Sequence, residues 1–129
     1  MCLIDRVESW DRVTIRGCTR SHHNPANPLR HNTRLEAIAG LEYAAQVMGV
    51  HLGLLDPMRS RNGMIGYIGS VRDVVLGVDR LDEYPSELVI DATRMFEGDQ
   101  SFIYQFAIAA GTRDVIKGRA SLFLKTVHS

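Results

Sequence analysis

The sequence predicts an α+β domain in which a curved antiparallel sheet wraps around one central buried helix. Three observations carry this prediction. One long segment is apolar with helical spacing, several others have the two-residue periodicity of strands, and the length of 129 residues suits a single domain covering residues 1–129. Because the helix is apolar on nearly all sides, it needs a sheet around it.

The helix is predicted over residues 37–55, AIAGLEYAAQVMGVHLGLL. The apolar residues at helical spacing are Ile38, Leu41, Ala45, Met48 and Leu52. The opposite side is also apolar or small, so we expect burial nearly all round, with Glu42 inside. A membrane span would have this length, but one carboxylate at the bilayer centre costs about 2.5–3.5 kcal/mol. The sequence therefore favours a core helix with no membrane span.

Two extended segments and a long loop precede the helix. The extended segments cover residues 2–10 and 12–19, and in the second Val13 and Ile15 alternate with polar residues. Residues 21–34 contain two prolines and three histidines without apolar periodicity, which indicates a loop. Ordered loops of this length are often functional.

Four strands are predicted after the helix and a polar turn at residues 59–63. They cover residues 64–76 with an interruption at Arg72-Asp73, then 87–96, 101–109 and 113–124, with a hairpin turn at Gly111-Thr112. One helix inside such an antiparallel sheet is the hot-dog fold. An isolated copy leaves one helix face and one sheet edge uncovered, so we expect a dimer.

Composition excludes several classes of protein. The 15 Lys and Arg balance the 15 Asp and Glu, which argues against nucleic acid as a partner. Two cysteines, Cys2 and Cys18, make neither a disulfide framework nor a zinc site, and no metal is expected. Acidic residues near the N-terminus leave no apolar core for a signal peptide, so we expect a cytoplasmic protein.

Charge is unevenly distributed along the chain. Residues 12–35 contain five arginines and no carboxylate. Such a segment is either a solvated surface or a basic rim around a binding site, and the sequence leaves both readings open.

Two residues stand out as candidates for acid–base chemistry. Burial should raise the pKa of Glu42 and make it a proton donor, and Gln46, one helical turn on, could orient it. His23 follows a strand and has an intrinsic pKa suited to proton abstraction. From the residues alone, Glu42 could equally be a structural carboxylate and His23 an exposed loop residue.

Four segments resemble the FabA/FabZ family of β-hydroxyacyl-[acyl-carrier-protein] dehydratases. His23-Asn24-Pro25-Ala26-Asn27-Pro28 resembles the signature His-Phe-Pro-Gly-(Asn/Asp/His)-Pro, and Leu41-Glu42-Tyr43-Ala44-Ala45-Gln46 resembles Ile-Glu-Ala-Met-Ala-Gln of the central helix. Cys2-Leu3-Ile4-Asp5-Arg6-Val7 and Gly118-Arg119-Ala120 resemble the family's opening and its last strand. The helix motif and the lengthened loop are most similar to the ApeP-like branch, predicted dehydratases of aryl-polyene clusters.

The resemblance implies a reaction and a role for each residue. His23 would take the C2 proton of a 3-hydroxyacyl thioester and Glu42, from the opposite subunit, would protonate the leaving hydroxyl. The Ala37 N–H would bind the thioester carbonyl. Asn27, Pro28 and Gln46 would contact the substrate. No cofactor is implied beyond the phosphopantetheine of an acyl carrier protein that carries the substrate.

The basic segment and the alternatives complete the sequence-based account. Acyl carrier proteins are typically acidic, so Arg30 and Arg34 are candidates for carrier docking. The leading hypothesis is a dehydratase. The alternatives are a catalytically weak hot-dog subunit that pairs with an active dehydratase, and a hot-dog acyl thioesterase. We expect a homodimer, a heterodimer with another hot-dog protein, or a higher oligomer.

Overall fold

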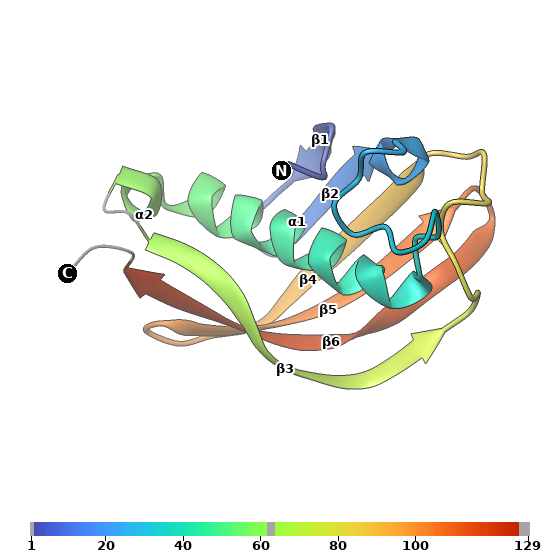
Figure 1. The fold of residues 1–129 in the computed structure, drawn as a ribbon. Helices are drawn as coiled ribbons and strands as arrows, with labels where there is room; N and C mark the ends of the chain where they lie inside the picture. Colours follow the sequence, from blue (N-terminus) through green and yellow to red (C-terminus); the bar gives the residue numbers. More distant parts are fainter. Residues whose placement is uncertain (1, 62–63, 127–129) are drawn as a thin grey trace.

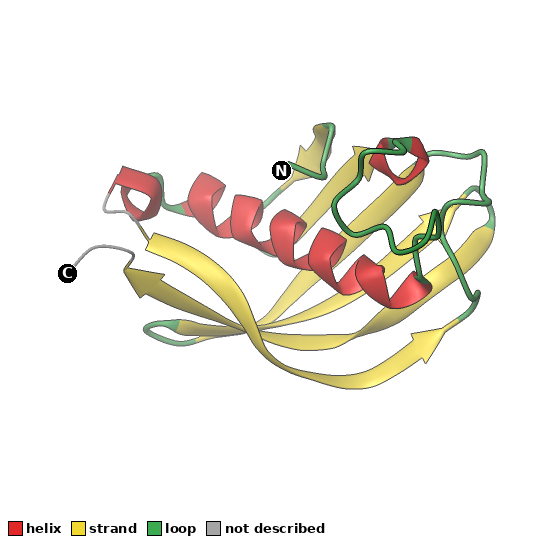
Figure 2. Ribbon diagram, in the orientation of Figure 1, coloured by secondary structure: helices red, strands yellow, loops and turns green. Residues whose placement is uncertain are grey.

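The computed structural model describes residues 2–61 and 64–126 and contains one curved antiparallel sheet with a helix lying against one face (Figures 1 and 2). The six strands lie in the order β1-β2-β4-β5-β6-β3. Their bounds are Arg6–Trp10 (β1), Thr14–Thr19 (β2), Met64–Leu76 (β3), Leu88–Glu97 (β4), Ser101–Ala110 (β5) and Arg113–Thr126 (β6). This is the predicted hot-dog arrangement.

The central helix α1 covers Gly40–Leu55 and continues a 3₁₀ turn, η2, at Ala37–Ala39, so together they match the predicted segment. Two short helical turns accompany it: η1 at Ser21–His23 within the long loop, and α2 at Met58–Arg61 where a polar turn was predicted. Residues 62 and 63 of that turn lie outside the described residues. Gly40 allows close packing, because a Cβ there would lie 2.7 Å from Cγ2 of Ile116.

The core lies between α1 and the concave face of the sheet. The predicted inward faces of β5 and β6 are confirmed; their buried residues include Phe102, Tyr104, Phe106, Ile108, Ile116, Ala120 and Leu122. The predicted hairpin turn is also confirmed, with Gly111 at a φ of 62° that an L side chain rarely adopts.

Strand β3 differs from prediction at its expected interruption. It runs continuously from Met64 to Leu76, and its register with β6 shifts between Arg72 and Val75. Asp73 has a φ of 56° at this shift. The predicted break is thus a β-bulge, which bends a strand without ending it. The first strand is also shorter than predicted and begins only at Arg6.

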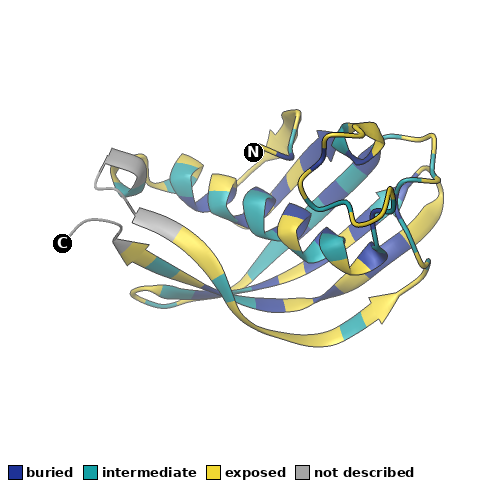
Figure 3. Cartoon of the chain, in the orientation of Figure 1, coloured by how far each residue is buried: buried dark blue, intermediate teal, exposed yellow. Residues whose placement is uncertain are grey.

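Helix α1 is buried on one side, so the expectation of burial all round is wrong for the single chain. Glu42, Val50 and Leu54 are exposed on α1, and Ile38 in the preceding turn η2 is 50% exposed; Figure 3 shows the exposed and buried sides of the helix. The reason is geometric, since one sheet covers one face of a helix. Residues 37–55 are long and apolar enough for a membrane span by length and composition, but their inner face packs on the sheet.

Besides the uncovered face of α1, the chain has an uncovered edge of the sheet. Strand β3 lies at the edge beside β6. Exposed apolar side chains on these two strands are Tyr67, Val71, Val75, Leu76 and Phe123. Such surfaces are typical of interfaces, so they support the expected dimer without placing the second copy.

Candidate functional site

The loop after β2 places two adjacent histidines against one backbone carbonyl. Nε2 lies 3.0 Å from the Tyr84 oxygen in His22 and 2.5 Å from it in His23. Because a carbonyl only accepts hydrogen bonds, both Nε2 atoms carry the hydrogen and, in each neutral ring, Nδ1 holds the lone pair. The two ring centroids are 3.9 Å apart.

The two histidines differ in exposure. His22 is fully buried, and its Nδ1 has no hydrogen-bond partner in the described chain. Burial, followed by the neighbouring His23, lowers the pKa of His22 despite its hydrogen bond to Tyr84. His23 is exposed. The histidine singled out from the sequence is therefore the exposed one of the pair, and no sequence motif marks Tyr84.

Asn27 ties the loop to α1. Its Nδ2 donates to the Ser21 carbonyl and to the Tyr43 hydroxyl, both at 3.0 Å, and its Oδ1 accepts from the Leu29 N–H. The Tyr43 hydroxyl is also 2.9 Å from Ser21 Oγ. Asn27 is buried, whereas Pro28 beside it is exposed. In this structure the amide that was predicted to contact substrate makes its hydrogen bonds within the chain.

Arg30 stabilises the conformation of the loop, residues 21–34, that carries His22 and His23. Its guanidinium donates to the carbonyls of His22 (2.8 Å), Asn24 (2.9 Å) and Thr33 (2.9 Å). An arginine with three backbone acceptors is a structural element of the loop as well as a surface charge.

Replacing Arg30 by Ala is expected to lower the free energy of unfolding by about 1–3 kcal/mol, because three carbonyls lose a charged donor. Hydrogen exchange of the loop amides should rise at the same time. Denaturant unfolding measures the first effect, with Arg12→Ala, which removes an exposed arginine outside this loop, as the matched control. Equal stability of the two variants would contradict the assigned role.

Glu42 and Gln46 lie on α1, one turn apart. Glu42 is exposed, so the expected burial of its carboxyl does not occur in the single chain. Gln46 is half-buried, and its Oε1 accepts a 2.7 Å hydrogen bond from the Leu3 N–H. Among the described residues, no hydrogen bond joins Glu42 to His23. The resemblance assigns the roles of these two side chains to opposite subunits.

The segment before α1 is held by the connection between β3 and β4. The Ala37 N–H donates to the Asp79 carbonyl at 3.0 Å, and Leu35 and Leu81 pair through a 2.7 Å backbone hydrogen bond. The Leu35 N–H also donates to Asp82 Oδ1 at 3.0 Å. The N–H that was predicted to bind a thioester carbonyl is therefore engaged in this structure.

Ion pairs reinforce this segment. Arg80 pairs with Asp82, and this contact holds the pKa of the Asp82 carboxyl well below its usual range. Arg34 Nε lies 2.8 Å from Glu36 Oε1, so the carboxylate next to Ala37 faces a guanidinium. Arg34 and Arg30, the two residues predicted to dock a carrier protein, both have partners within the chain.

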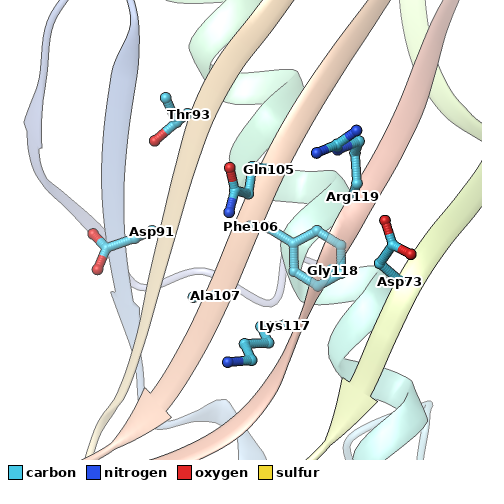
Figure 4. Close-up of a pocket in the computed structure, with 9 residues that line it drawn as sticks. All are labelled: Asp73, Asp91, Thr93, Gln105, Phe106, Ala107, Lys117, Gly118 and Arg119. Carbon is cyan, nitrogen blue, oxygen red and sulfur yellow. The ribbon is translucent and has the colours of Figure 1, made fainter.

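Two open grooves border this segment. One, of about 370 Å³, is lined by residues that include Arg34, Arg80 and Tyr84; the other, of about 390 Å³, includes Glu36, Leu76 and Gly77. A third hollow of about 430 Å³ lies on the outer face of the sheet, and neither histidine is among the residues that line it (Figure 4). Among the described residues, no cluster of His, Cys, Asp and Glu could hold a metal ion.

Comparison with solved structures shows the fold of the chain. A dehydratase heterocomplex, ApeI:P, from Xenorhabdus doucetiae matches with a TM-score of 0.85 at 16% identity, over 98% of this chain and 84% of that chain. A hypothetical thioesterase protein with coenzyme A from Streptococcus pneumoniae matches with a TM-score of 0.64 at 15% identity, over 96% and 88%. A thioesterase family protein from Silicibacter pomeroyi matches with a TM-score of 0.66 at 12% identity, over 94% and 84%.

Comparison with family models shows the family. No curated protein matches the chain. The model described as ApeP-like, ApeP dehydratase, matches residues 1–128, nearly the whole sequence. This match agrees with the resemblance found in the motifs around His23 and Glu42. The chain therefore belongs to the ApeP-like dehydratase family.

Proposed function

We propose that the protein dehydrates 3-hydroxyacyl thioesters carried on an acyl carrier protein to trans-2-enoyl thioesters, in fatty-acid or polyene-type biosynthesis in the cytoplasm. The observation that carries the proposal is the exposed His23 imidazole, whose Nε2–H is fixed by the Tyr84 carbonyl at 2.5 Å so that Nδ1 is left as a base. Membership of a dehydratase family supports the same reaction.

The proposed acid is Glu42 of a second hot-dog subunit. Glu42 is exposed on the face of α1 that the sheet leaves uncovered. The chain also has exposed apolar side chains on the edge strand β3, where a second subunit could pack. A partner that covers this face would bury the carboxyl, and burial favours the protonated form of a carboxyl group. The base and the acid would then approach one substrate from two chains.

The proposed reaction balances with these two groups. Nδ1 of His23 takes the proton from C2, the electron pair forms the C2–C3 double bond, and the C3–O bond breaks as Glu42 donates a proton to the hydroxyl, which leaves as water. Proton exchange with solvent returns both groups to their starting forms. No metal or redox cofactor is required for this chemistry.

The thioester carbonyl also needs a hydrogen-bond donor, which we place in the turn η2 just before α1. The Ala37 N–H can serve only if it leaves the Asp79 carbonyl, 3.0 Å away. The arrangement of Arg34 beside Glu36 favours binding there, because it offsets a carboxylate that would oppose negative charge on the thioester oxygen.

Turnover of a small 3-hydroxyacyl thioester tests the proposal directly. We expect an enoyl thioester to form, with loss of turnover in His23→Ala and retention in His22→Gln if the latter folds. Loss in His22→Gln alone would move the base to the buried ring. Release of free thiol without an enoyl product would contradict dehydration and indicate a thioesterase.

A second candidate function is that of a weak subunit in a heterocomplex. The engaged Ala37 N–H favours it, as does the similarity in fold to a chain of a dehydratase heterocomplex. Turnover that appears only after a second hot-dog protein is added would support this alternative over the stand-alone enzyme.

A further inference from the structure

One buried hydroxyl on α1 contacts the loop on both sides of His23. The Tyr43 side chain is fully buried in the core, and its hydroxyl lies 2.9 Å from Ser21 Oγ and 3.0 Å from Asn27 Nδ2. Ser21 begins the turn η1, which ends at His23, and Asn27 follows His23 by four positions. We propose that Tyr43 is a positioning residue for the His23 base of its own chain, an inference that rests on the proposed function.

The hydrogen bonds around this hydroxyl favour one arrangement of protons. Asn27 Nδ2 donates to the Ser21 carbonyl and Asn27 Oδ1 accepts from the Leu29 N–H, so the orientation of the amide is fixed. The Tyr43 oxygen therefore accepts from Asn27 and donates its own hydrogen to Ser21 Oγ. Ser21 Oγ in turn donates to the Leu3 carbonyl at 2.7 Å. The Tyr43 hydroxyl is thus both an acceptor for the segment after the histidines and a donor to the segment before them.

Burial makes these contacts of Tyr43 hard to replace. Tyr43 and Asn27 are buried and Ser21 is half-buried, so water has little access to their polar atoms. A buried donor that loses its acceptor costs the full desolvation of that group. Burial also raises the pKa of Tyr43, so its hydroxyl keeps its hydrogen throughout the neutral range. The contacts are therefore in place at the pH at which a histidine acts as a base.

The exposed His23 ring depends on the backbone of η1 for its direction. Among the described residues, its side chain forms one hydrogen bond, from Nε2 to the Tyr84 carbonyl, and otherwise lies beside the His22 ring. These contacts select the tautomer, but the position of Nδ1 follows the turn that Ser21 begins. A displacement of about 1 Å at a reacting group can cost about a hundredfold in rate. Anchoring Ser21 to the core through Tyr43 therefore bears directly on proton abstraction.

Tyr43 and Glu42 are neighbours in the sequence but serve different sites in the proposed dimer. Successive residues of a helix are about 100° apart around its axis, and here Glu42 is exposed whereas Tyr43 is buried. In the proposed reaction, Glu42 acts on a substrate held with His23 of the other chain. Tyr43 contacts the loop of its own chain. Loss of the Tyr43 hydroxyl should therefore impair the site that contains the His23 of the same chain, and spare the site that contains its Glu42.

Mixed dimers with one complete site test this difference between the two sites. A Glu42→Gln chain paired with a His23→Ala chain forms one complete site, from His23 of the first chain and Glu42 of the second. Tyr43→Phe in the first chain is expected to lower kcat by about ten- to a hundredfold with little change in KM. The same substitution in the second chain is the matched control, because the loop that it affects there already lacks its histidine. Equal losses in both mixtures, or no loss in either, would overturn the inference.

Nitrogen NMR of the histidine rings provides a second readout that needs no turnover. In the wild type, His23 should show a protonated Nε2 and an unprotonated Nδ1, because Nε2 donates to the Tyr84 carbonyl. In Tyr43→Phe, the two nitrogens should shift toward an average of both tautomers. Tyr104→Phe, which removes a different buried hydroxyl, should leave them unchanged.

The NMR result separates this inference from the proposed function. His23 signals, assigned with the His23→Ala variant, that are identical in the wild type and in Tyr43→Phe would overturn the inference whatever the protein catalyses. A wild-type protein without turnover would contradict the proposed function, and a shift of the His23 nitrogens in Tyr43→Phe would still support the positioning role.

Discussion

Replacing Glu42 by Gln is expected to lower kcat for dehydration by about 10²–10⁴-fold, the usual contribution of a general acid. The amide keeps the shape of the side chain but cannot supply the proton that the leaving hydroxyl needs. Because Glu42 is exposed in the single chain, the change should leave its fold intact. Turnover of a 3-hydroxyacyl thioester measures the effect.

Two controls make this result specific. The thermal unfolding of Glu42→Gln should match that of the wild type. Glu97→Gln, which alters a glutamate paired with Arg94 near the β4–β5 hairpin, should keep wild-type turnover. Full activity in Glu42→Gln would remove the acid from the proposed mechanism.

Replacing His51 by Leu is expected to lower the free energy of unfolding by about 2–5 kcal/mol, because it leaves buried polar groups without partners. His51 is fully buried on α1. Its Nε2 lies 2.7 Å from the Asp11 carbonyl and its Nδ1 lies 2.6 Å from the Tyr104 hydroxyl. Nε2 therefore donates to the Asp11 carbonyl, and in the neutral ring Nδ1 accepts a hydrogen bond from the Tyr104 hydroxyl.

Denaturant unfolding of His51→Leu, Tyr104→Phe and the double variant measures this coupling. The double variant should be more stable than the sum of the two single losses, because it removes both partners of the hydrogen bond. Strict additivity would contradict the coupling.

The same histidine gives stability a pH dependence. Burial lowers the pKa of His51 below the ordinary histidine value of 6.5. The unfolded chain then takes up a proton before the folded chain, so stability is fully present above pH 6.5 and is lost as the pH falls toward the folded pKa. Burial acts on His22 in the same direction. His51→Leu should reduce this loss of stability between pH 7 and 5; an unchanged pH profile would contradict the assignment.

The order of elements and the faces of the strands could be predicted because both follow from local patterns. Alternation placed Phe102 and Ile116 in the core, and Gly111 marked the hairpin. The exposure of Glu42 could not be predicted, since periodicity reports that a helix face is apolar but does not report whether sheet or a second subunit covers it.

The contacts that form the candidate site could not be predicted from the sequence either. The Tyr84 carbonyl accepts hydrogen bonds from His22 and His23, which lie more than sixty positions earlier in the chain. The Asp79 carbonyl accepts a hydrogen bond from the Ala37 N–H. Backbone acceptors leave no residue-type signature, so no motif marks them. The sequence predicts a positive charge at Arg30. Its hydrogen bonds to three backbone carbonyls could not be predicted, because they depend on the conformation of the loop.

The central claim, a dehydratase site shared between two copies of the hot-dog subunit, is tested most directly by mixing two inactive variants. His23→Ala and Glu42→Gln chains are unfolded, mixed in equal amounts and refolded, and enoyl formation is measured. Half of the resulting dimers should be mixed, each with one intact site of two, so activity should return to about a quarter of the wild-type level. Activity no higher than that of the separately refolded variants would contradict a shared site.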